Sequence, residues 1–439
     1  MKIKTFHHGT HPPQDKERTA ENAIEIMPPP EKVLIPLLQH FGSPALPLVK
    51  KGEDVYLGQK IGESPALFSA PIHSSVSGKI LAIEDYNHPS GIPLPVMIIA
   101  NDGQDRPGPE KNISQDPFSL SPEQIRQRVR EAGVVGLGGA AFPTAVKLSP
   151  PKDKPIDTII INGCECEPLL TSDYRLMVEY PEEILKGAEL VRLATGASRI
   201  IVGIEDNKPR AAEILKEHID NLPAEIALLR TKYPQGAEKN LISALLDREV
   251  PRGGLPFDVG ALVQNVGTAK AIWEAVSCGE PLYKRAITVS GDAIREPKNL
   301  LARIGTPFQK IIDFCGGLEE RANIVVMGGP MMGISQWTLD APLIKGTTGL
   351  LAWTVSAFPR EHSCVRCARC VEHCPMGLVP TQLAKLVQYE KFEEAEKWGI
   401  VDCVECGCCQ YICPAKIALV HWIRLGKNKI SSMKSKKSA

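Results

Sequence analysis

The pattern of apolar and polar positions divides the chain into regions of different character. Residues 31–100 alternate short apolar runs with Gly, Pro and Asp turns, which is typical of small β-structure. A helix is then expected from Pro122, N-capped by Ser121, and strands and helices alternate after it. We expect strands at 158–162, 199–204 and 225–230 and helices at 181–195 and 208–221. This βαβαβ order predicts a parallel, Rossmann-like sheet.

The remaining segments have simpler patterns. Residues 286–330 are β-rich with a helical middle at 307–314, which predicts a small mixed module. Residues 336–360 have the character of a linker. Residues 1–30 are polar and rich in proline, so they are expected to wrap over other parts of the molecule rather than form a core. Residues 421–439 are basic and are expected to be a disordered, solvated tail.

Composition and charge narrow the class of protein. The 439 residues are 43% hydrophobic and 23% charged, which is typical of a globular chain of roughly three domains. The formal net charge of zero provides no global basic field for binding nucleic acid. No apolar run approaches the roughly 18 residues of a membrane span, and the N-terminus lacks an apolar core of signal-peptide length. We therefore expect a cytoplasmic chain.

Eight of the 13 cysteines form two runs with the same spacing. The runs are Cys364-x2-Cys367-x2-Cys370-x3-Cys374-Pro375 and Cys403-x2-Cys406-x2-Cys409-x3-Cys413-Pro414. This is the spacing of a bacterial two-cluster ferredoxin, in which the fourth cysteine of each run serves the other cluster. We expect one [4Fe–4S] cluster on Cys364, Cys367, Cys370 and Cys413, and a second on Cys403, Cys406, Cys409 and Cys374.

Zinc is the alternative to iron–sulfur clusters, but zinc knuckles use paired CxxC motifs and do not need the third cysteine or the x3-Cys-Pro. Thiolates assembled into clusters indicate a reducing compartment. Between the runs, residues 381–398 are strongly helical with Leu383, Leu386 and Val387 on one face, which favours a helical ferredoxin. Cys408 lies outside the register of the runs and is interpreted as a packed residue.

A glycine-rich run, Gly133-x2-Gly136-x-Gly138-Gly139, lies ahead of the first expected strand of the parallel sheet. It is neither G-x-G-x-x-G nor a Walker loop, and taken alone it could be a tight turn. In its context it indicates that the backbone comes close to a bulky ligand whose phosphate lies on the amides. Lys147 follows soon after and could pair with that phosphate.

Two strand–turn–strand pieces, at 49–62 and 70–83, resemble the two halves of a biotinyl/lipoyl-type barrel-sandwich hybrid domain. Such domains carry their cofactor on a lysine at a hairpin tip. The comparable tip here, His73 to Gly78, contains no lysine. We therefore expect a structural role and no lipoylation or biotinylation.

Four motifs resemble, in the same order, loops of the NADH-binding flavoprotein subunit of respiratory complex I. They are GVVGLGGAAFPTAVKL (133–148), NGCECEP (162–168), YPQGAE (233–238) and QNVGT (264–268). The chain departs from that family at Cys164, Cys166 and Gly267, where polar or acidic side chains are usual. Flavin contacts through these side-chain positions are not expected.

The resemblance implies a site for FMN and a nicotinamide nucleotide. The FMN-binding residues would be Gly136, Gly138, Gly139, Lys147, Asn162, Asn265 and Thr268. The nucleotide would face Phe142, Glu167, Tyr233 and Glu238, and Glu165 and Gly236 are further candidates in the same loops. Carboxylates here would accept ribose hydrogen bonds and repel a 2′-phosphate, which favours NAD over NADP. The alternatives are a solvated acidic turn for the two glutamates of the NGCECEP motif and core packing for the two aromatic residues.

Over about residues 5–425 the chain resembles the C subunit of the Rnf ion-translocating oxidoreductases. HHGTHPPQDKERT (7–19), the lysine-free barrel-sandwich, the flavin motifs, a β-grasp (SLBB-like) module and the helical ferredoxin occur in that family's order. The resemblance implies a peripheral subunit on the cytoplasmic face of the cell membrane. It would pass electrons from NADH through FMN and two [4Fe–4S] clusters to an iron–sulfur subunit of a complex that couples NADH and ferredoxin redox to ion movement.

The expected fold is therefore multidomain, α/β plus β. Its segments are a wrapping segment (1–30), a barrel-sandwich hybrid (31–104), a Rossmann-like FMN/NADH-binding domain (115–285), a β-grasp module (286–335), a linker (336–360), a helical two-cluster ferredoxin (361–420) and a basic tail (421–439). Three other functions remain open: a soluble flavin/iron–sulfur reductase such as a cobalamin reductase, a relay subunit without its own NADH site, and a direct quinone reductase.

Overall fold

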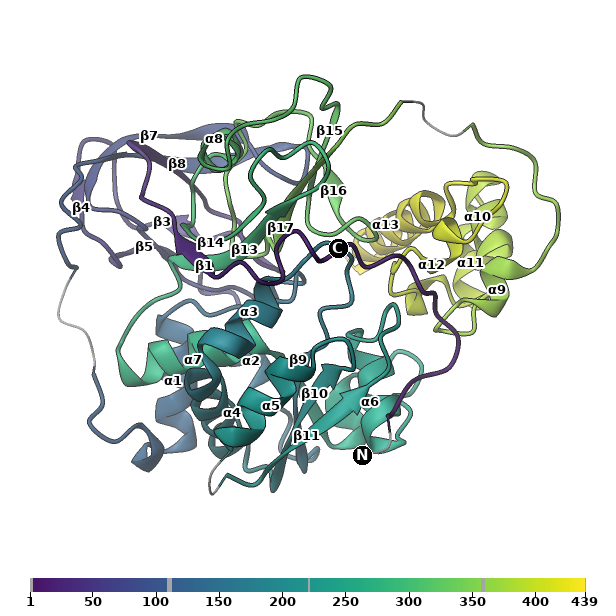
Figure 1. The fold of residues 1–439 in the computed structure, drawn as a ribbon, viewed down its shortest axis with the longest axis horizontal. Coiled ribbons are helices and arrows are strands. Elements are labelled where there is room, and N and C mark those ends of the chain that lie inside the picture. Colours follow the sequence, from purple (N-terminus) through teal and green to yellow (C-terminus); the bar gives the residue numbers. More distant parts are fainter. Residues whose placement is uncertain (1–2, 109–112, 220–221, 357–359, 439) are drawn as a thin grey trace.

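A computed structural model describes residues 3–108, 113–219, 222–356 and 360–438. The strands within these ranges form a β-domain, a parallel-sheet domain and a mixed-sheet module, and a helical module carries the two cysteine runs. In Figure 1 the helical module (yellow) lies beside both the parallel-sheet domain and the mixed sheet. The expected combination of β and α/β architecture is confirmed.

The β-domain consists of two small antiparallel sheets that share one core. In spatial order the first contains β2 (Lys32–Pro36), β8 (Pro93–Asn101), β7 (Gly78–Asn87) and β4 (Asp54–Val55), and the second contains β3 (Leu46–Pro47), β5 (Lys60–Glu63) and β6 (Ile72–His73). Alternate side chains of both sheets, among them Val33, Ile61 and Met97, fill the space between them. This is the expected barrel-sandwich.

The hairpin tip of this domain is buried, unlike the exposed tip at which related domains carry a lysine. Ser74, Ser75 and Ser77 are 0% exposed. Ser75 Oγ donates a hydrogen bond of 2.6 Å to the Ile304 carbonyl of the mixed-sheet module. The tip therefore connects the β-domain to the mixed-sheet module.

The parallel-sheet domain has the strand order β11 (Ala224–Leu229), β10 (Arg199–Glu205), β9 (Thr158–Gly163) and β12 (Ala261–Asn265). Its helices are α1 (Pro122–Glu131), α2 (Thr144–Lys147), α3 (Ser172–Glu179), α4 (Pro181–Thr195), α5 (Pro209–Glu217), α6 (Glu238–Leu246) and α7 (Val266–Ser277), with short 3-10 turns at Pro117–Ser119 and Pro256–Val259. Ser121 caps α1 as expected, since its Oγ accepts the Gln124 N–H at 3.3 Å.

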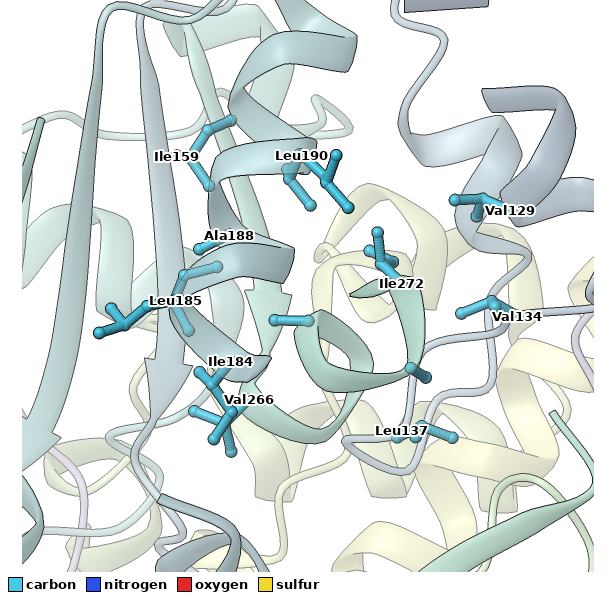
Figure 2. Packing of buried hydrophobic residues seen from close by; sticks show 14 of the residues in the cluster. Val129, Val134, Leu137, Ile159, Ile184, Leu185, Ala188, Leu190, Val266 and Ile272 are labelled. Atoms are coloured by element: carbon cyan, nitrogen blue, oxygen red, sulfur yellow. The ribbon is translucent and has the colours of Figure 1, made fainter. Parts of the chain in front are cut away.

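Both faces of this sheet are buried because successive residues of β9 are apolar. Ile159 and Ile161 pack into the core formed with α1, α4 and α7, whereas Ile160 packs on the opposite side with α6. Figure 2 shows the first of these cores, with Leu185 of α4 and Ile272 of α7 among its side chains.

The same core holds the glycine-rich run in place. Val134 and Leu137 of the run belong to it, together with Val129 of α1 and Val266 of α7 (Figure 2). Apolar packing therefore holds one side of the run against the core, while Gly138 and Gly139 remain exposed on the other.

The mixed-sheet module contains two strands that the sequence did not predict, one from the N-terminal segment and one from the expected linker. Its order is β1 (Ile24–Ile26), β14 (Lys298–Arg303), β13 (Lys284–Ser290), β17 (Gly349–Trp353), β15 (Ile324–Met327) and β16 (Ile334–Ser335), with α8 (Phe308–Phe314) packed on it. The expectation of a linker over 336–360 was wrong for 349–353, because β17 lies inside the sheet between β13 and β15. Its buried Leu350, Leu351 and Ala352 supply core contacts.

The helical module contains α9 (Arg369–Glu372), α10 (Pro380–Gln388), α11 (Phe392–Lys397), a 3-10 turn (Ile400–Asp402), α12 (Cys408–Tyr411) and α13 (Leu419–Ser438). The helical stretch expected at 381–398 is divided into α10 and α11. Leu383, Leu386 and Val387 are buried together, as their spacing predicted.

The expectation of a disordered basic tail was wrong for the described residues. Residues up to 438 form α13, which buries Ile423 and Ile430 against α10 and α11. Lys427 also pairs with Glu405 at 2.5 Å, and Lys434 pairs with Glu396 at 2.5 Å. Apolar residues at helical spacing therefore dock this helix despite its charge.

The N-terminal segment crosses the molecule from the parallel-sheet domain, past the helical module, to β1 (dark purple in Figure 1). Its backbone pairs with other parts on the way, since Lys4 bonds to Leu228 and Thr10 bonds to Tyr233. In the described ranges, no helix combines the length and apolar character needed to cross a bilayer.

Candidate functional site

The candidate site is built at the carboxyl edge of the parallel sheet, where β9 and β12 end side by side. Asn162 and Asn265 are paired across these strands. The Asn265 side chain caps α7 by accepting the N–H of Gly267 at 2.8 Å and of Thr268 at 3.3 Å. Thr268 Oγ1 in turn accepts the Leu137 N–H at 2.8 Å. The expected QNVGT turn and glycine-rich run are thus brought together, at the edge where α/β sheets bind ligands.

The exposed part of the glycine-rich run offers an anion cradle. Gly138, Gly139 and Ala140 are exposed, and their backbone N–H groups donate no hydrogen bond to the residues that the structure describes. Gly139 has φ +104°, a conformation that side chains rarely adopt, which explains the requirement for glycine. Gly136 lies just before them and donates its N–H to the Phe142 carbonyl at 2.9 Å. Successive free amides of this kind can bind a phosphate.

Lys147, the cation expected beside that phosphate, is paired within the protein. Its Nζ lies 2.5 Å from Glu238 Oε1, and both side chains are partly exposed. The two residues that the sequence assigned to different ligands therefore neutralise each other in this structure.

Asn162 and Gly236 hold two of the motif loops together. Asn162 Nδ2 donates to the Gly236 carbonyl at 2.9 Å, and its Oδ1 accepts the Cys164 N–H at 3.0 Å. A Cβ on Gly236 would lie 2.4 Å from the Cys164 carbonyl oxygen, so only glycine allows this approach. Both residues position the loops.

Glu165, which the sequence assigned to the cofactor site, is buried and does not face an open site in this structure. Its carboxylate caps α3 by accepting the N–H of Asp173 at 2.8 Å and of Tyr174 at 3.2 Å, and the residue is buried. The amine of Lys16, from the N-terminal segment, donates to the carbonyls of Glu165, Glu167 and Leu170. Glu165 and Lys16 therefore shape the acidic loop.

Asp173 is a site residue that sequence reasoning missed. It accepts a 2.6 Å hydrogen bond from Asn265 Nδ2, and burial together with the charge of Glu165 raises its pKa to about 7. A cavity beneath the turn is lined by Asp173, Gly267 and Arg285. The only sequence signal was its position in the helix that follows the acidic loop.

Tyr233, whose ring the sequence assigned to the nucleotide, is buried against the helical module. The residue is 1% exposed, and its hydroxyl donates to the Cys406 carbonyl at 2.7 Å. Its backbone pairs with Thr10 of the N-terminal segment. The helical module packs on this loop and leaves no open ring face.

Glu167 is likewise engaged within the protein rather than open to a nucleotide. Its carboxylate accepts the N–H of Met331 at 3.0 Å and of Met332 at 2.9 Å. Burial raises its pKa to about 7, although these two hydrogen bonds act in the opposite direction.

Next to Tyr233, both side-chain polar atoms of Gln235 are buried and have no partner among the described residues.

The Phe142 side chain is partly exposed, and its ring contacts two other aromatic rings. Its ring lies 5.7 Å from that of Phe41 and 5.9 Å from that of Phe68, both of which belong to the β-domain. Nothing in the sequence patterns indicated this contact between domains.

The two cysteine runs adopt the same backbone turn. Arg366 and Glu405, each two residues after the first cysteine of its run, have φ +56°, and each donates its N–H to that cysteine's sulfur at 3.4 Å. Ala368 and Gly407, two residues further on, are also left-handed. The repeated spacing therefore corresponds to a repeated structure.

Cys374 of the first run lies with the second run. An apolar cavity is lined by Cys374, Cys403, Cys406, Cys408 and Cys409. Cys370 and Cys413 pack together in a neighbouring apolar cluster, whereas Cys364 and Cys367 are exposed. This is the placement that exchange of the fourth cysteines requires.

The arrangement of these sulfurs fits a cubane cluster. In the part of the chain that the structure describes, no three His, Cys, Asp or Glu side chains converge on one metal position. Five cysteines line one cavity, and the four of them that belong to the repeated spacing would supply one thiolate to each iron of a cubane.

Comparison with known proteins identifies the parts of the chain. The matching family models are described as RnfC barrel sandwich hybrid domain (residues 4–104), Nuo51 FMN-binding domain (129–274), SLBB domain (286–335) and 4Fe-4S dicluster domain (359–414). FMN and two [4Fe–4S] clusters are therefore its cofactors.

Three relatives match nearly the whole chain. The C subunit of the proton-translocating ferredoxin:NAD(+) oxidoreductase complex of Clostridium ljungdahlii is 47% identical over 97% of this chain and 94% of that protein. The C subunit of the Na(+)-translocating ferredoxin:NAD(+) oxidoreductase complex of Acetobacterium woodii is 44% identical over 99% of each chain. The C subunit of the ion-translocating oxidoreductase complex of Rhodobacter capsulatus is 42% identical over 98% of this chain and 84% of that protein.

Proposed function

The chain belongs to the C-subunit family of the Rnf ion-translocating oxidoreductase complexes, and we propose that it is the NADH-oxidising electron-entry subunit of such a complex. Membership of the family makes it an electron-transfer subunit that works with other subunits of a membrane complex. The proposal adds the donor and the route. NADH delivers electrons to the parallel-sheet domain, and they leave through the helical module to an iron–sulfur partner subunit on the cytoplasmic face of the membrane.

The contact between Tyr233 and Cys406 is the observation that carries this route. The hydroxyl of a residue in a flavin-domain loop donates directly to the carbonyl of a cluster-binding cysteine. The Cys408 sulfur lies 3.8 Å from the Tyr233 carbonyl in the same contact. A cofactor on the sheet edge and a cluster on the second cysteine run would thus be neighbours, which single-electron transfer needs.

The glycine-rich run and the loops around it would hold FMN. The amides of Gly138, Gly139 and Ala140 are free to bind its phosphate, and Lys147 can add a charge once it leaves Glu238. Gly136, Asn162, Gly236, Asn265 and Thr268 keep the loops in the shape that accepts the flavin. Bound FMN supplies the conversion between two-electron and one-electron transfer.

The cysteines would hold the two clusters with exchanged fourth ligands. Cys374 joins Cys403, Cys406 and Cys409 around one cavity, and Cys413 joins Cys370 beside the exposed Cys364 and Cys367. The first run lies on the outside, with Val365 67% exposed. This exposed run is our candidate for the surface that meets the iron–sulfur partner.

The relay subunit without its own NADH site is the second candidate function. Its support is that Tyr233 is buried and that the Glu167 carboxylate is engaged by two backbone N–H groups, since both residues were expected to face the nucleotide. The NADH proposal therefore relies on the accessible face around Phe142 and the free amides.

Anaerobic addition of NADH to the FMN- and cluster-loaded chain tests the proposal. Bleaching of the flavin and cluster absorbance by NADH is expected, with little response to NADPH. A chain that carries FMN and iron but keeps its spectrum when NADH is added would contradict the NADH-entry role and favour the relay.

A further inference from the structure

Three phenylalanines from two domains form an exposed aromatic cluster beside the glycine-rich run. Phe41 and Phe142 are stacked, with ring centroids 5.7 Å apart and planes at 26°. Phe68 meets Phe41 edge-on at 6.3 Å and Phe142 at 5.9 Å. Phe41 is 59% exposed and Phe68 is 44% exposed, so both rings present a free face. We call these three residues the aromatic cluster.

The two rings of the β-domain are held in place by their backbones. The Phe41 N–H donates to the Ala141 carbonyl at 3.0 Å, which ties it to the residue before Phe142. The Ser43 N–H donates to the Phe68 carbonyl at 2.8 Å, so the two β-domain loops are joined. A Cβ on Gly42 would lie 2.0 Å from that carbonyl oxygen, and φ of +113° also requires glycine there. The rings are therefore preorganised.

A second anchor comes from His40. Its Nε2 lies 3.2 Å from Ser69 Oγ and accepts the Ala70 N–H at 3.1 Å. Burial, followed by the charge of Lys345, lowers the pKa of His40 to about 4, so the ring is neutral near pH 7 and can accept this bond. Both sides of the loop pair that carries Phe41 and Phe68 are thus fixed.

The position of the aromatic cluster points to a ligand that combines phosphate with a planar ring. Phe142 lies two residues after Ala140, the last of the free amides of Gly138, Gly139 and Ala140. Exposed aromatic faces bind nucleobases by stacking, and this interaction needs no deep pocket. The other aromatic residue assigned to the nucleotide, Tyr233, is buried.

We propose that Phe41 and Phe68 of the β-domain, together with Phe142, form the stacking site for the adenine ring of the nicotinamide dinucleotide. This inference rests on the proposed function, because it places one half of the same substrate. The β-domain then has a binding role although it carries no lysine at its tip. The other possible occupant is an apolar face of another subunit, which the experiment distinguishes.

The test compares ligands with and without adenine. NADH and reduced nicotinamide mononucleotide, which lacks the adenylate half, are oxidised by the FMN- and cluster-loaded chain, and ADP-ribose binding is measured separately by calorimetry. Phe41→Leu and Phe68→Leu keep apolar bulk without a ring. Each is expected to raise the KM for NADH and the Kd for ADP-ribose about tenfold, in the range of one lost stacked base. The KM for the mononucleotide is expected to stay unchanged.

Two further variants serve as controls for the loss of the aromatic ring. Phe41→Trp retains a ring and is expected to restore ADP-ribose binding. Leu46→Ala changes another exposed apolar residue of the β-domain, at 62% exposure, and is expected to leave both ligands unaffected. FMN content and thermal unfolding confirm that each variant is folded and loaded.

The outcomes separate the inference from the proposed function. If the wild-type chain does not oxidise NADH, the proposed function fails. If it does, but Phe41→Leu and Phe68→Leu bind ADP-ribose normally, only the adenine site is overturned. Normal binding combined with loss of co-purification of the membrane subunits would assign the aromatic cluster to a subunit interface instead.

Discussion

The two cysteine runs have the same spacing and the same turns, yet their first two cysteines differ in exposure. Cys364 and Cys367 of the first run are exposed. Cys406 and Cys409 of the second run are buried, and the run meets the flavin-domain loops through Tyr233. Local sequence thus sets the shape of a cluster-binding loop, whereas its neighbours decide whether it faces inward or outward.

The difference has a functional meaning under the proposed route. The buried run touches the domain that receives electrons, and the exposed run is free to meet a partner. The mixed-sheet loop at Met331 adds to the asymmetry, because a Cβ on Gly407 would lie 2.8 Å from the Met331 carbonyl. The equivalent Ala368 in the first run already carries a Cβ. We therefore expect perturbations of the second run to have larger effects.

The largest effect is expected from removing one ligand of each run. Cys406→Ala and Cys367→Ala should each lower the iron content from about eight to about four atoms per chain. NADH should reduce the remaining cluster in Cys367→Ala but not in Cys406→Ala, because the second run adjoins the flavin domain. Iron analysis and electron paramagnetic resonance after NADH addition measure both. Cys278→Ser, at an exposed isolated cysteine, is the control, and equal NADH reduction in both variants would remove the proposed asymmetry.

Tyr233→Phe tests the contact of the second run with the flavin-domain loop by deleting one hydrogen bond. Loss of the bond to the buried Cys406 residue should cost about 1 kcal/mol in stability. It should also shift the reduction potential of the second-run cluster while leaving that of the first. Chemical unfolding and a redox titration are the measurements. Tyr411→Phe, at a 43% exposed residue of α12, should change neither, and a shift confined to the first-run cluster would contradict the assignment.

The pH dependence of stability should reflect Glu167. Its folded pKa of about 7 lies above the ordinary value of 4.5, so the folded protein holds a proton that the unfolded chain has released. This contribution is fully present below pH 4.5 and is lost as pH rises through 7. Glu167→Gln should flatten the fall in melting temperature between these pH values. An unchanged slope in the variant would show that the carboxyl is not the titrating group.

The smallest effect on the chain itself is expected at the exposed run. Val365→Asp changes a residue that is 67% exposed and should alter stability by no more than about 0.5 kcal/mol. Co-purification with the iron–sulfur partner should nevertheless fall, because the new carboxylate would lie in the proposed contact. Retention of the partner by this variant would place the exit surface elsewhere.

Much of the fold was predictable because local sequence patterns determine many of its helices and strands. The strands β9, β10 and β11 and the helices α1, α4 and α5 lie within a few residues of their predicted ranges, since each has a clear apolar period and turn boundaries. The strand β12 and the helices α3, α6 and α7 were not predicted. The linker and tail expectations failed where local composition and long-range packing disagree. The short run Gly349–Trp353 lies in a segment with the composition of a linker, yet it completes the sheet between β13 and β15.

The candidate site shows the same division. Gly138 and Gly139 lie exposed at the sheet edge, where their motif predicted a ligand. Glu165 and Tyr233 are residue types that can bind a nucleotide. In the structure, however, the Glu165 carboxylate caps the N-terminus of α3, and the Tyr233 hydroxyl bonds to the helical module. A motif specifies which groups a loop carries, while their partners come from segments that the motif does not contain.

By itself, the sequence determined the chemical inventory of this protein: two repeated thiolate loops, a glycine-rich turn and the order of the domains. Those features depend on residue types at short spacing, which local backbone geometry converts directly into structure. The tertiary structure alone decided that Tyr233 meets Cys406 and that Phe41 and Phe68 reach Phe142. These contacts join residues from separate domains, and their packing follows from burial and backbone hydrogen bonds that no local pattern records.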